Sequence, residues 1–355
     1  MFSSRRGLLR TLAIFCLALV ATTGGWPRNG KTTAEWLIAG YVPWTLPSHV
    51  TIERTAEGRY QYLVNGTPTT FIGIGYNAIN RFLPDAERAA NYHRDFKIMC
   101  EAGINHITGW DADKGYEQDK FDELTLEIAL QYGIGVLMPI NLPPEGDYRD
   151  PAFVAGLKAH AEEKALRFKD HPALRMWGVG NEVLTEMPRE MYPAFAQAYL
   201  EIIDRVHELD ANHPVIYREA EDRFVPAIRR FLDRRGERPW FLYGMNIYSL
   251  ELERVLDEWP HNELYRPLFV TEFGAEPDWS GGRSLNYVGM WRMIRAHPDF
   301  ALGGAPYVWT TEGPEPVDKK WGLMDGQSRP VDETFQQLAE EWRREADNAG
   351  RKCPA

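Results

Sequence analysis

The chain has 355 residues, of which 44% are hydrophobic and 12% aromatic, so it can bury a large core, and a single α/β barrel commonly has this length. Its formal net charge of −11 argues against a nucleic-acid partner, because phosphate binding needs clustered cations, but it does not exclude neutral ligands such as sugars. The three cysteines have neither the spacing of a zinc site nor the number expected of a disulfide framework.

The first residues, Met1–Gly24, have the layout of an export signal. Arg5, Arg6 and Arg10 precede an apolar run, Leu12–Val20, which is short for a membrane span, and small residues follow it. The arginine pair also resembles a twin-arginine signal, and an uncleaved anchor is the alternative interpretation. We therefore expect an exported protein, periplasmic or extracellular, without membrane contact after the signal is removed.

Residues 25–70 are predicted to form an irregular extension followed by a β-hairpin. Residues 25–49 are rich in Pro, Gly and Trp, whereas Val50–Arg54 and Tyr60–Val64 alternate as strands do. Asn65-Gly66 predicts a two-residue hairpin turn, because both residue types tolerate a positive φ. Together with the following Thr it is also formally a glycosylation acceptor, but the turn is the preferred interpretation.

From residue 71 to residue 346, short apolar runs alternate with amphipathic stretches of helical period. The expected strands are Phe71–Asn77, Asn105–Trp110, Gly135–Ile140, Leu174–Gly180, Val215–Glu219, Phe241–Tyr248, Leu268–Glu272 and Leu302–Trp309. The expected helices cover approximately residues 90–102, 121–132, 151–168, 193–209, 224–234, 251–259, 284–296 and 333–346. Eight alternating units predict a single-domain (β/α)8 TIM barrel of the α/β class, followed by a polar tail at 347–355, rather than an open doubly wound sheet.

In this fold, active sites lie where the barrel strands end at the C-terminal face. The residues at these predicted ends are Tyr76-Asn77, Trp110-Asp111, Asn141, Asn181-Glu182, Glu219, Asn246 with Tyr248, Glu272 and Trp309. The set contains acids, amides and aromatic rings, but neither a His–Cys cluster nor a Gly-rich phosphate loop. The stretch Asp111–Gly115 faintly resembles a calcium loop, but its glycine and distal Glu fall out of register. We therefore expect no metal and no cofactor.

Two carboxylates at the mouth of a barrel suit the cleavage of a glycosidic bond. One carboxyl group has to be protonated to donate to the leaving oxygen, and the other has to be ionised to attack the anomeric carbon or to activate water. Proximity helps, because the charge of one carboxylate raises the pKa of the other. Aromatic faces stack on sugar rings and amides bind hydroxyl groups, so the set predicts an oligo- or polysaccharide substrate.

Two motifs resemble those of clan A glycoside hydrolases. The stretch WGVGNE, which ends at Glu182, resembles the clan's fourth-strand Asn-Glu motif, and LFVTEFG, which contains Glu272, resembles its seventh-strand nucleophile motif. The predicted strand order places both acids on the corresponding strands. The resemblance implies that Glu182 is the acid/base and Glu272 the nucleophile of a retaining mechanism, in which the two carboxyl groups lie about 5–5.5 Å apart.

The resemblance also implies roles for neighbouring residues. Asn181 is expected to hydrogen-bond the sugar 2-hydroxyl group. Tyr248, in MNIY, resembles the sixth-strand tyrosine that contacts the nucleophile, and Trp309, in YVW, resembles the eighth-strand tryptophan beneath the central sugar. The other residues predicted to bind substrate are Asn246, Asn77 and Trp110. Packing on loops or in the core is the alternative role of the aromatic residues.

Within the clan, the Asn-x-Tyr pattern and the ending WGLMDGQSRP resemble the barrel of glycoside hydrolase family 2 most. Family 5 and the β-1,3-glucanosyltransferases of family 72 are similar in outline. Residues 25–70 are too few for the sandwich domains that precede the family 2 barrel. One position departs from the pattern: GINHIT resembles the second-strand motif but ends on Thr108, where the clan has an arginine that supports the nucleophile.

Other residues are expected to have structural roles. Trp177 lies inside a predicted strand and is expected in the core. Glu219 and Glu221 are expected to form salt bridges in a loop. Cys100 is expected to be a buried small hydrophobic residue, and although a bridge to Cys353 is feasible, we do not expect one.

These observations predict a retaining glycoside hydrolase that cleaves β-linked glycans. A β-glucan transglycosylase of the same fold is the first alternative, because only the acceptor differs, and products longer than the substrate would distinguish it. A non-catalytic glycan-binding barrel is the second alternative, and Thr108 is its best support.

Overall fold

The computed structural model describes residues 46–80, 82–110, 121–220, 222–232, 238–261, 266–276 and 278–353. The expected export signal, the first part of the extension at residues 25–45 and the calcium-like stretch Asp111–Gly115 lie outside these residues. From Leu46 onward the chain forms one compact unit.

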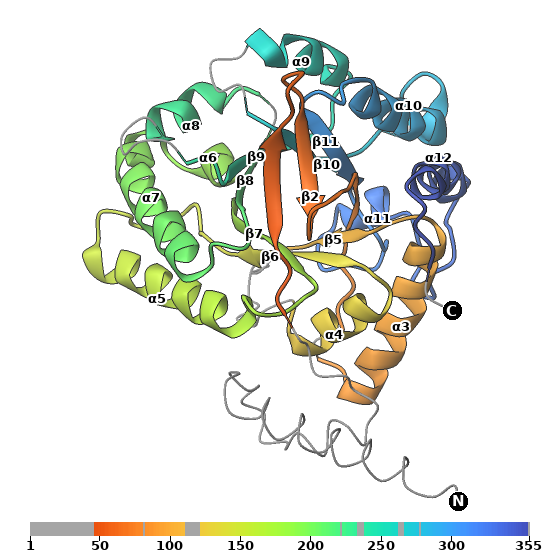
Figure 1. Cartoon of the computed structure of the whole chain (residues 1–355), viewed down its shortest axis with the longest axis horizontal. Helices are drawn as coiled ribbons and strands as arrows, with labels where there is room; N and C mark the ends of the chain where they lie inside the picture. Colours follow the sequence, from red (N-terminus) through yellow and green to blue (C-terminus); the bar gives the residue numbers. More distant parts are fainter. Residues whose placement is uncertain are drawn as a thin grey trace, which may run out of the picture. The chain divides into compact units, whose positions relative to one another are not determined.

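Parallel strands close into an eight-stranded barrel with helices around it (Figure 1). The barrel strands are β4 (Phe71–Gly75), β5 (His106–Thr108), β6 (Gly135–Ile140), β7 (Leu174–Asn181), β8 (Val215–Ala220), β9 (Phe241–Ile247), β10 (Leu268–Phe273) and β11 (Ala301–Pro306). They pair in chain order, and β11 pairs with β4 to close the ring. The predicted (β/α)8 barrel is confirmed.

The helices that alternate with the strands agree with the predicted stretches. They are α3 (Asp85–Glu101), α4 (Glu123–Gln131), α5 (Pro151–Phe168), α7 (Tyr192–Leu209), α8 (Val225–Leu232), α9 (Leu252–Glu258), α10 (Gly282–Ala296) and α12 (Thr334–Asn348). Two short helices that the sequence did not indicate follow β7 and β11, namely α6 (Val183–Glu186) and α11 (Asp318–Trp321). None of the helices in the described ranges has the length and apolar character needed to cross a membrane.

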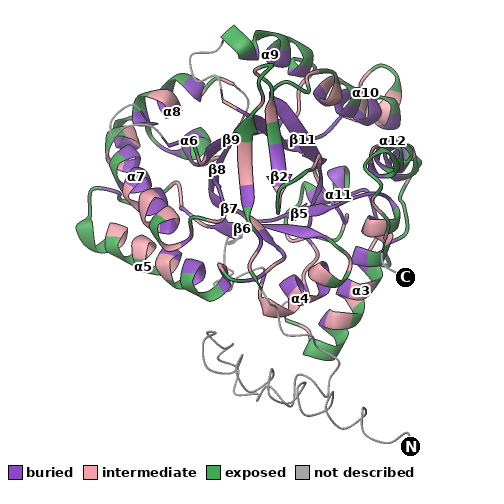
Figure 2. Cartoon of the chain, in the orientation of Figure 1, coloured by how far each residue is buried: buried purple, intermediate pink, exposed green. Residues whose placement is uncertain are grey.

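The barrel strands are buried along almost their whole length (Figure 2). Helices cover their outer faces, and a cluster of buried side chains lies inside the barrel. Trp177 is fully buried on β7, as predicted, and its indole donates to Asp210 at 2.8 Å. The helices bury one face only. In α7, for example, Phe195, Tyr199 and Val206 lie at helical spacing on the buried side.

A three-stranded sheet covers the N-terminal end of the barrel. It consists of β1 (Val50–Arg54), β2 (Tyr60–Val64) and β3 (Thr67–Pro68), and the predicted Asn65-Gly66 turn joins the last two with positive φ angles of 52° and 75°. Tyr62 hydrogen-bonds His106, at the start of β5, at 2.8 Å. The face of the barrel that carries the strand ends is therefore at the opposite end.

The residues of this sheet complete a hydrophobic cluster inside the barrel. Its buried members are Val50, Tyr62, Phe71, Leu137, Met176, Ile216, Leu242, Phe269, Leu302 and Ala305. They come from the covering sheet and from strands around the barrel, so the interior is packed core rather than a pore. The short sheet thus stabilises the end of the barrel that does not carry the acids.

The expectation for the cysteines was wrong. Cys100, near the end of α3, forms a disulfide with Cys353, 253 residues later. The sequence offered no spacing rule for such a distant pair. In the structure, Arg343 and Arg351 donate to the carbonyls of Glu101 and Gly103, so the C-terminal residues lie at the end of α3. The predicted polar tail is thus attached to the barrel by a covalent bond.

Candidate active site

The carboxyl ends of β7 and β10 place Glu182 and Glu272 at the same face of the barrel. Glu182 directly follows β7 and precedes α6, with a φ of 50°, which is uncommon for a residue other than glycine. Gly180, two residues earlier, has a φ of 77°, a backbone conformation that favours glycine, and belongs to the same turn. The strand therefore ends in a sharp change of direction at the Asn181-Glu182 pair.

Glu182 is held by its backbone and by an amide. Its N–H donates to the carbonyl of Arg218 on β8 at 2.9 Å. Asn246 Nδ2 donates to Oε1 of Glu182 at 3.1 Å and to Oδ1 of Asn181 at 3.2 Å, while Asn246 Oδ1 accepts from Thr271. Asn246 thus connects the ends of β7, β9 and β10, and it fixes the orientation of the first acid.

Glu272 lies deeper and accepts two hydrogen bonds from aromatic side chains. The residue is 4% exposed, Trp110 Nε1 donates to its Oε1 at 2.9 Å, and the hydroxyl of Tyr248 donates to its Oε2 at 2.5 Å. Tyr307 packs edge-on against both aromatic rings. Both donors stabilise the ionised form of Glu272, because a carboxylate is the stronger acceptor.

The surroundings of the two carboxyl groups affect their pKa values differently. Burial and then the charge of Glu272 raise the pKa of Glu182 to about 8. Burial also raises the pKa of Glu272, but hydrogen bonds from Tyr248 and Trp110 and the charge of Arg218 act in the opposite direction. These surroundings favour the protonated form of Glu182 at neutral pH, whereas Glu272 has the donors that favour a carboxylate.

Arg218, which the sequence did not indicate, supplies a cation near the position where Thr108 replaces the clan's arginine. It is a buried residue of β8, and its Nη1 donates to Thr108 Oγ1 at 3.1 Å and to the Gly109 carbonyl at 2.9 Å. A side chain on Gly244 of β9 would meet the stem of Arg218 at 2.9 Å, so that glycine leaves room for it. The charge of Arg218 lowers the pKa of Glu272.

The remaining predicted binding residues lie at the same face, but Asn77 and Trp309 have structural contacts of their own. Both polar atoms of Asn77 bond the backbone of Thr310, at 2.8 and 2.9 Å. Trp309 is only 1% exposed and packs edge-on against Phe335. Asn77 therefore orients the chain after β11, and the contact of these two residues with a sugar stays a prediction.

Among the residues that the structure describes, Glu219 has hydrogen-bond donors rather than the partner of a loop salt bridge. Its carboxylate is buried and accepts from the backbone N–H groups of Leu184 and Ala220 and from the hydroxyls of Thr185 and Tyr217, at 2.6 to 2.9 Å. These bonds hold the first turn of α6, which begins directly after Glu182. The expectation for Glu219 was wrong because it treated the end of β8 as exposed. Glu221, for which a loop salt bridge was also predicted, lies outside the described residues.

The site has the composition of an acid/base pair. Within the described ranges, no three His, Cys, Asp or Glu side chains are grouped as metal ligands. Two coupled carboxyl groups, one kept protonated and one with hydrogen-bond donors to its charged form, can donate a proton and attack an electrophilic carbon.

The family model for the glycosyl hydrolases family 2 TIM barrel domain matches residues 132–299, which include both acids. The resemblance to clan A glycoside hydrolases is confirmed. The matched residues run from directly after α4 to the segment between α10 and β11. It therefore contains the two motifs on which the resemblance was based.

Curated relatives of this domain include β-glucuronidases of mammals. The β-glucuronidase of Sus scrofa is 26% identical over 242 residues, and that of Homo sapiens is 26% identical over 251 residues. Each alignment covers 66% of this chain, and 34% and 35% of the two relatives. The chain thus spans about a third of the length of the curated relatives that it matches.

Solved structures with the same barrel include two glycosidases that act on uronic acids, according to their names. A Bacteroides uniformis β-glucuronidase has a TM-score of 0.60 and 17% identity, covering 83% of this chain and 37% of that one. A family 2 β-galacturonidase of Eisenbergiella tayi, bound to galacturonate, has a TM-score of 0.59 and 20% identity, covering 84% and 54%. At these identities the likeness establishes the fold alone.

Proposed function

We propose that the protein is an exported retaining glycosidase that hydrolyses β-linked glycosides, with Glu272 as the nucleophile and Glu182 as the acid/base. The observation that carries the proposal is the asymmetry of the two carboxyl groups. Glu182 has a pKa raised to about 8, and Glu272 accepts hydrogen bonds from Trp110 and Tyr248. A two-carboxylate displacement needs one protonated and one ionised group.

In the first step, a carboxylate oxygen of Glu272 forms a bond to the anomeric carbon while the bond to the leaving oxygen breaks. Glu182 transfers its proton to that oxygen, so the leaving group departs as an alcohol. In the second step, water attacks the anomeric carbon, Glu182 accepts its proton, and the ester bond to Glu272 breaks. Two inversions at the same carbon give a product with the anomeric configuration of the substrate.

The chemistry of the glycone is set by contacts beyond the two acids. The similar proteins named above are β-glucuronidases and a β-galacturonidase, so aryl β-glucuronides and β-galacturonides belong in the first panel. β-1,3- and β-1,4-linked gluco-oligosaccharides complete it, because the predicted substrate is a β-linked glycan. The basic and apolar layout of Met1–Gly24 supports export.

Azide rescue of two alanine variants assigns the roles separately. Glu272→Ala should lose turnover by at least a thousandfold, and azide should then attack the β-glycoside directly and give the α-glycosyl azide. Glu182→Ala should still form the covalent intermediate from a 2,4-dinitrophenyl glycoside, and azide should then give the β-glycosyl azide. The configuration of each azide is read by proton NMR.

Several outcomes would contradict the proposal. Exchanged azide configurations would exchange the roles of the two acids, and a Glu272→Ala variant with substantial activity would remove the nucleophile. Products longer than the substrate would favour the transglycosylase. Glycan binding without cleavage, and without an adduct from a 2-fluoro glycoside, would favour a binding barrel. Circular dichroism of each variant checks that the barrel remains folded.

A further inference from the structure

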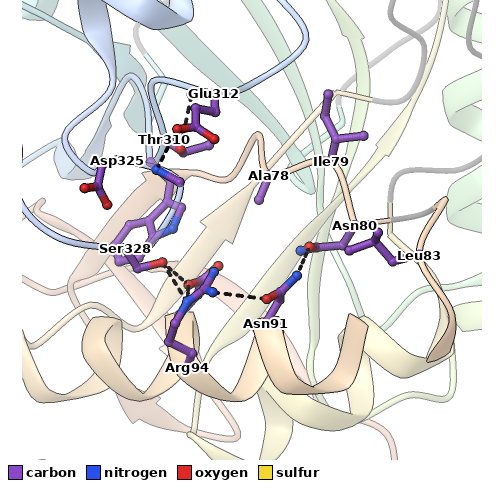
Figure 3. Close-up of a pocket in the computed structure, with 13 residues that line it drawn as sticks. Ala78, Ile79, Asn80, Leu83, Asn91, Arg94, Thr310, Glu312, Asp325 and Ser328 are labelled. Atoms are coloured by element: carbon purple, nitrogen blue, oxygen red, sulfur yellow. Dashed lines mark hydrogen bonds and ion pairs between the residues drawn. The ribbon is translucent and has the colours of Figure 1, made fainter. Parts of the chain in front are cut away.

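A cavity of about 160 Å³, lined by both polar and apolar side chains, lies beside Trp309, between α3 with the chain before it and the chain that follows β11 (Figure 3). One wall comes from lining residues between 78 and 95 and the other from lining residues between 309 and 328. In Figure 3, Asn91 and Arg94 rise from the helix on one side, and Glu312 and Asp325 come from the other. None of these four residues was assigned a role above.

The wall of this cavity is a fixed network rather than a loose surface. Arg94 donates through Nε to Asp95 and Ser328, at 2.9 Å each, and through Nη1 to Asn91 at 3.1 Å. Asn91 donates in turn to Asn80, which is buried. Asp95 and Ser328 are buried as well. The polar atoms therefore hold fixed positions before any ligand arrives, as a specific site requires.

The cavity lies across the barrel from the acid/base. Four steps separate β7 from β11 in either direction around the closed ring, so the strand that leads to Glu182 is opposite the strand that leads to Trp309. In the proposed mechanism, Glu182 protonates the leaving oxygen, so the leaving group lies on the β7 side. The sugar whose anomeric carbon reacts therefore extends toward β11 and β4, and the cavity lies next to the segments that follow these two strands, with Trp309 in its wall.

The composition of the cavity favours a neutral sugar. Its charged side chains are those of Arg94, Asp95, Glu312 and Asp325, which give a formal charge of −2. A uronate in this cavity would meet this negative charge, whereas the hydroxyl groups of a hexose can donate to carboxylates and accept from amides and a guanidinium. The volume is below the roughly 300–1,000 Å³ of ordinary ligand pockets, which fits a single ring.

We infer that this cavity is a second sugar subsite, which binds a neutral hexose β-linked to the non-reducing end of the sugar that reacts. The inference rests on the proposed function, since it uses Glu182 to define the side of the leaving group. It gives the enzyme a preference for a glycone of two or more sugars. Such an enzyme cleaves within chains or releases disaccharides rather than removing single sugars.

The test compares two substrates with the same leaving group. One is the 4-nitrophenyl β-glycoside of the panel that is hydrolysed fastest, and the other is the same glycoside extended by one β-1,3- or β-1,4-linked glucose at its non-reducing end. The longer substrate should have a kcat/KM at least tenfold higher. Asn91→Phe, which places a ring into the cavity, should remove most of this advantage.

A matched control adds the same ring to the same helix away from the cavity. Ala90 is exposed and does not line the cavity, so Ala90→Phe should keep the advantage of the longer substrate. Thermal unfolding of both variants detects a loss of fold that would lower activity on both substrates alike. In that event Asn91→Ala, which removes the amide without adding bulk, should still lower kcat/KM for the longer substrate alone.

The outcomes separate the two ideas. The subsite would be overturned if kcat/KM were equal for the shorter and the longer substrate with each linkage. It would also be overturned if a folded Asn91→Phe variant lost kcat/KM equally on both substrates. In either case, hydrolysis of the shorter glycoside would still uphold the proposed function. Absence of hydrolysis across the whole panel would overturn the proposed function, and the subsite defined through Glu182 would fall with it.

Discussion

Arg218 on β8 donates a hydrogen bond of 3.1 Å to Thr108 at the end of β5, so the fifth barrel strand brings a cation to the end of the second. The clan has an arginine at the position of Thr108, and its absence was the main support for a non-catalytic barrel. The charge of Arg218 lowers the pKa of Glu272, which is the effect that such an arginine provides. Although Thr108 replaces the clan's arginine, the proposed nucleophile therefore still has a cation nearby, namely Arg218.

Replacement of this cation should make Glu272 harder to ionise. In Arg218→Met the stem remains and the charge is lost, so the pKa of Glu272 should rise and the acidic limb of the kcat/KM profile should move to higher pH. A shift of one unit corresponds to about a tenfold loss on that limb. Arg218→Lys should shift the acidic limb less than Arg218→Met does. Thr108→Val leaves the charge of Arg218 in place and should shift the limb least. An unmoved acidic limb in a folded Arg218→Met variant would contradict this role.

Tyr248→Phe should weaken the proposed nucleophile without moving it far. The change removes the 2.5 Å hydrogen bond to Glu272 Oε2 and leaves the ring in its contacts with Tyr307 and Trp321. A hydrogen bond to a charged group contributes about 1.5–3 kcal/mol, which corresponds to roughly a 10- to 150-fold loss of kcat. Pre-steady-state kinetics with a 2,4-dinitrophenyl glycoside should show slower formation of the covalent intermediate. Unchanged kinetics would make Tyr248 a packing residue.

The alkaline side of the pH profile should report Glu182. Its pKa is raised to about 8, and only the protonated form can donate to the leaving oxygen. Activity on an unactivated glycoside should therefore fall as the pH rises through about 8. Glu182→Gln should lose at least a hundredfold on that substrate, but much less on a 2,4-dinitrophenyl glycoside, whose leaving group needs no proton. An alkaline limb that persists in the variant would assign it to another group.

The same group should make stability depend on pH. Since the pKa of Glu182 is higher in the folded state than its ordinary value of 4.5, its contribution is fully present below pH 4.5 and is lost as the pH rises through about 8. Glu182→Gln should therefore unfold at the same temperature as the unmodified protein at pH 4 and at a higher temperature at pH 9. Differential scanning calorimetry at both pH values measures this, and a constant difference would exclude the shift.

Reduction of the Cys100–Cys353 bond should destabilise the attachment of the C-terminal segment. The bond closes a loop of about 250 residues, and native disulfides typically stabilise a fold by about 2–4 kcal/mol. Dithiothreitol should lower the unfolding temperature of the unmodified protein by a few degrees. The double variant Cys100→Ser/Cys353→Ser is the matched control, and it should unfold at the reduced protein's temperature with or without reductant. Equal sensitivity to reductant in the variant would refute the bond.

The sequence by itself determined the barrel, its strand order and its two acids. Apolar runs such as Gly135–Ile140 predicted buried strands, and helical periods such as Pro151–Phe168 predicted their covering helices, with bounds that agree with the structure. Both signals are local, because each depends on residues within one element. Glu182 and Glu272 could be found in the same way, since each stands where a local apolar pattern ends.

Only the tertiary structure decided which residues support those acids. Arg218 and Glu219 lie on one strand, and nothing in their sequence neighbourhood indicates that the first reaches β5 or that the second holds the turn after β7. The disulfide joins residues at opposite ends of the barrel sequence. Such contacts depend on the closure of the ring, which brings strands distant in the chain within one side-chain length. Patterns within single elements do not contain that information.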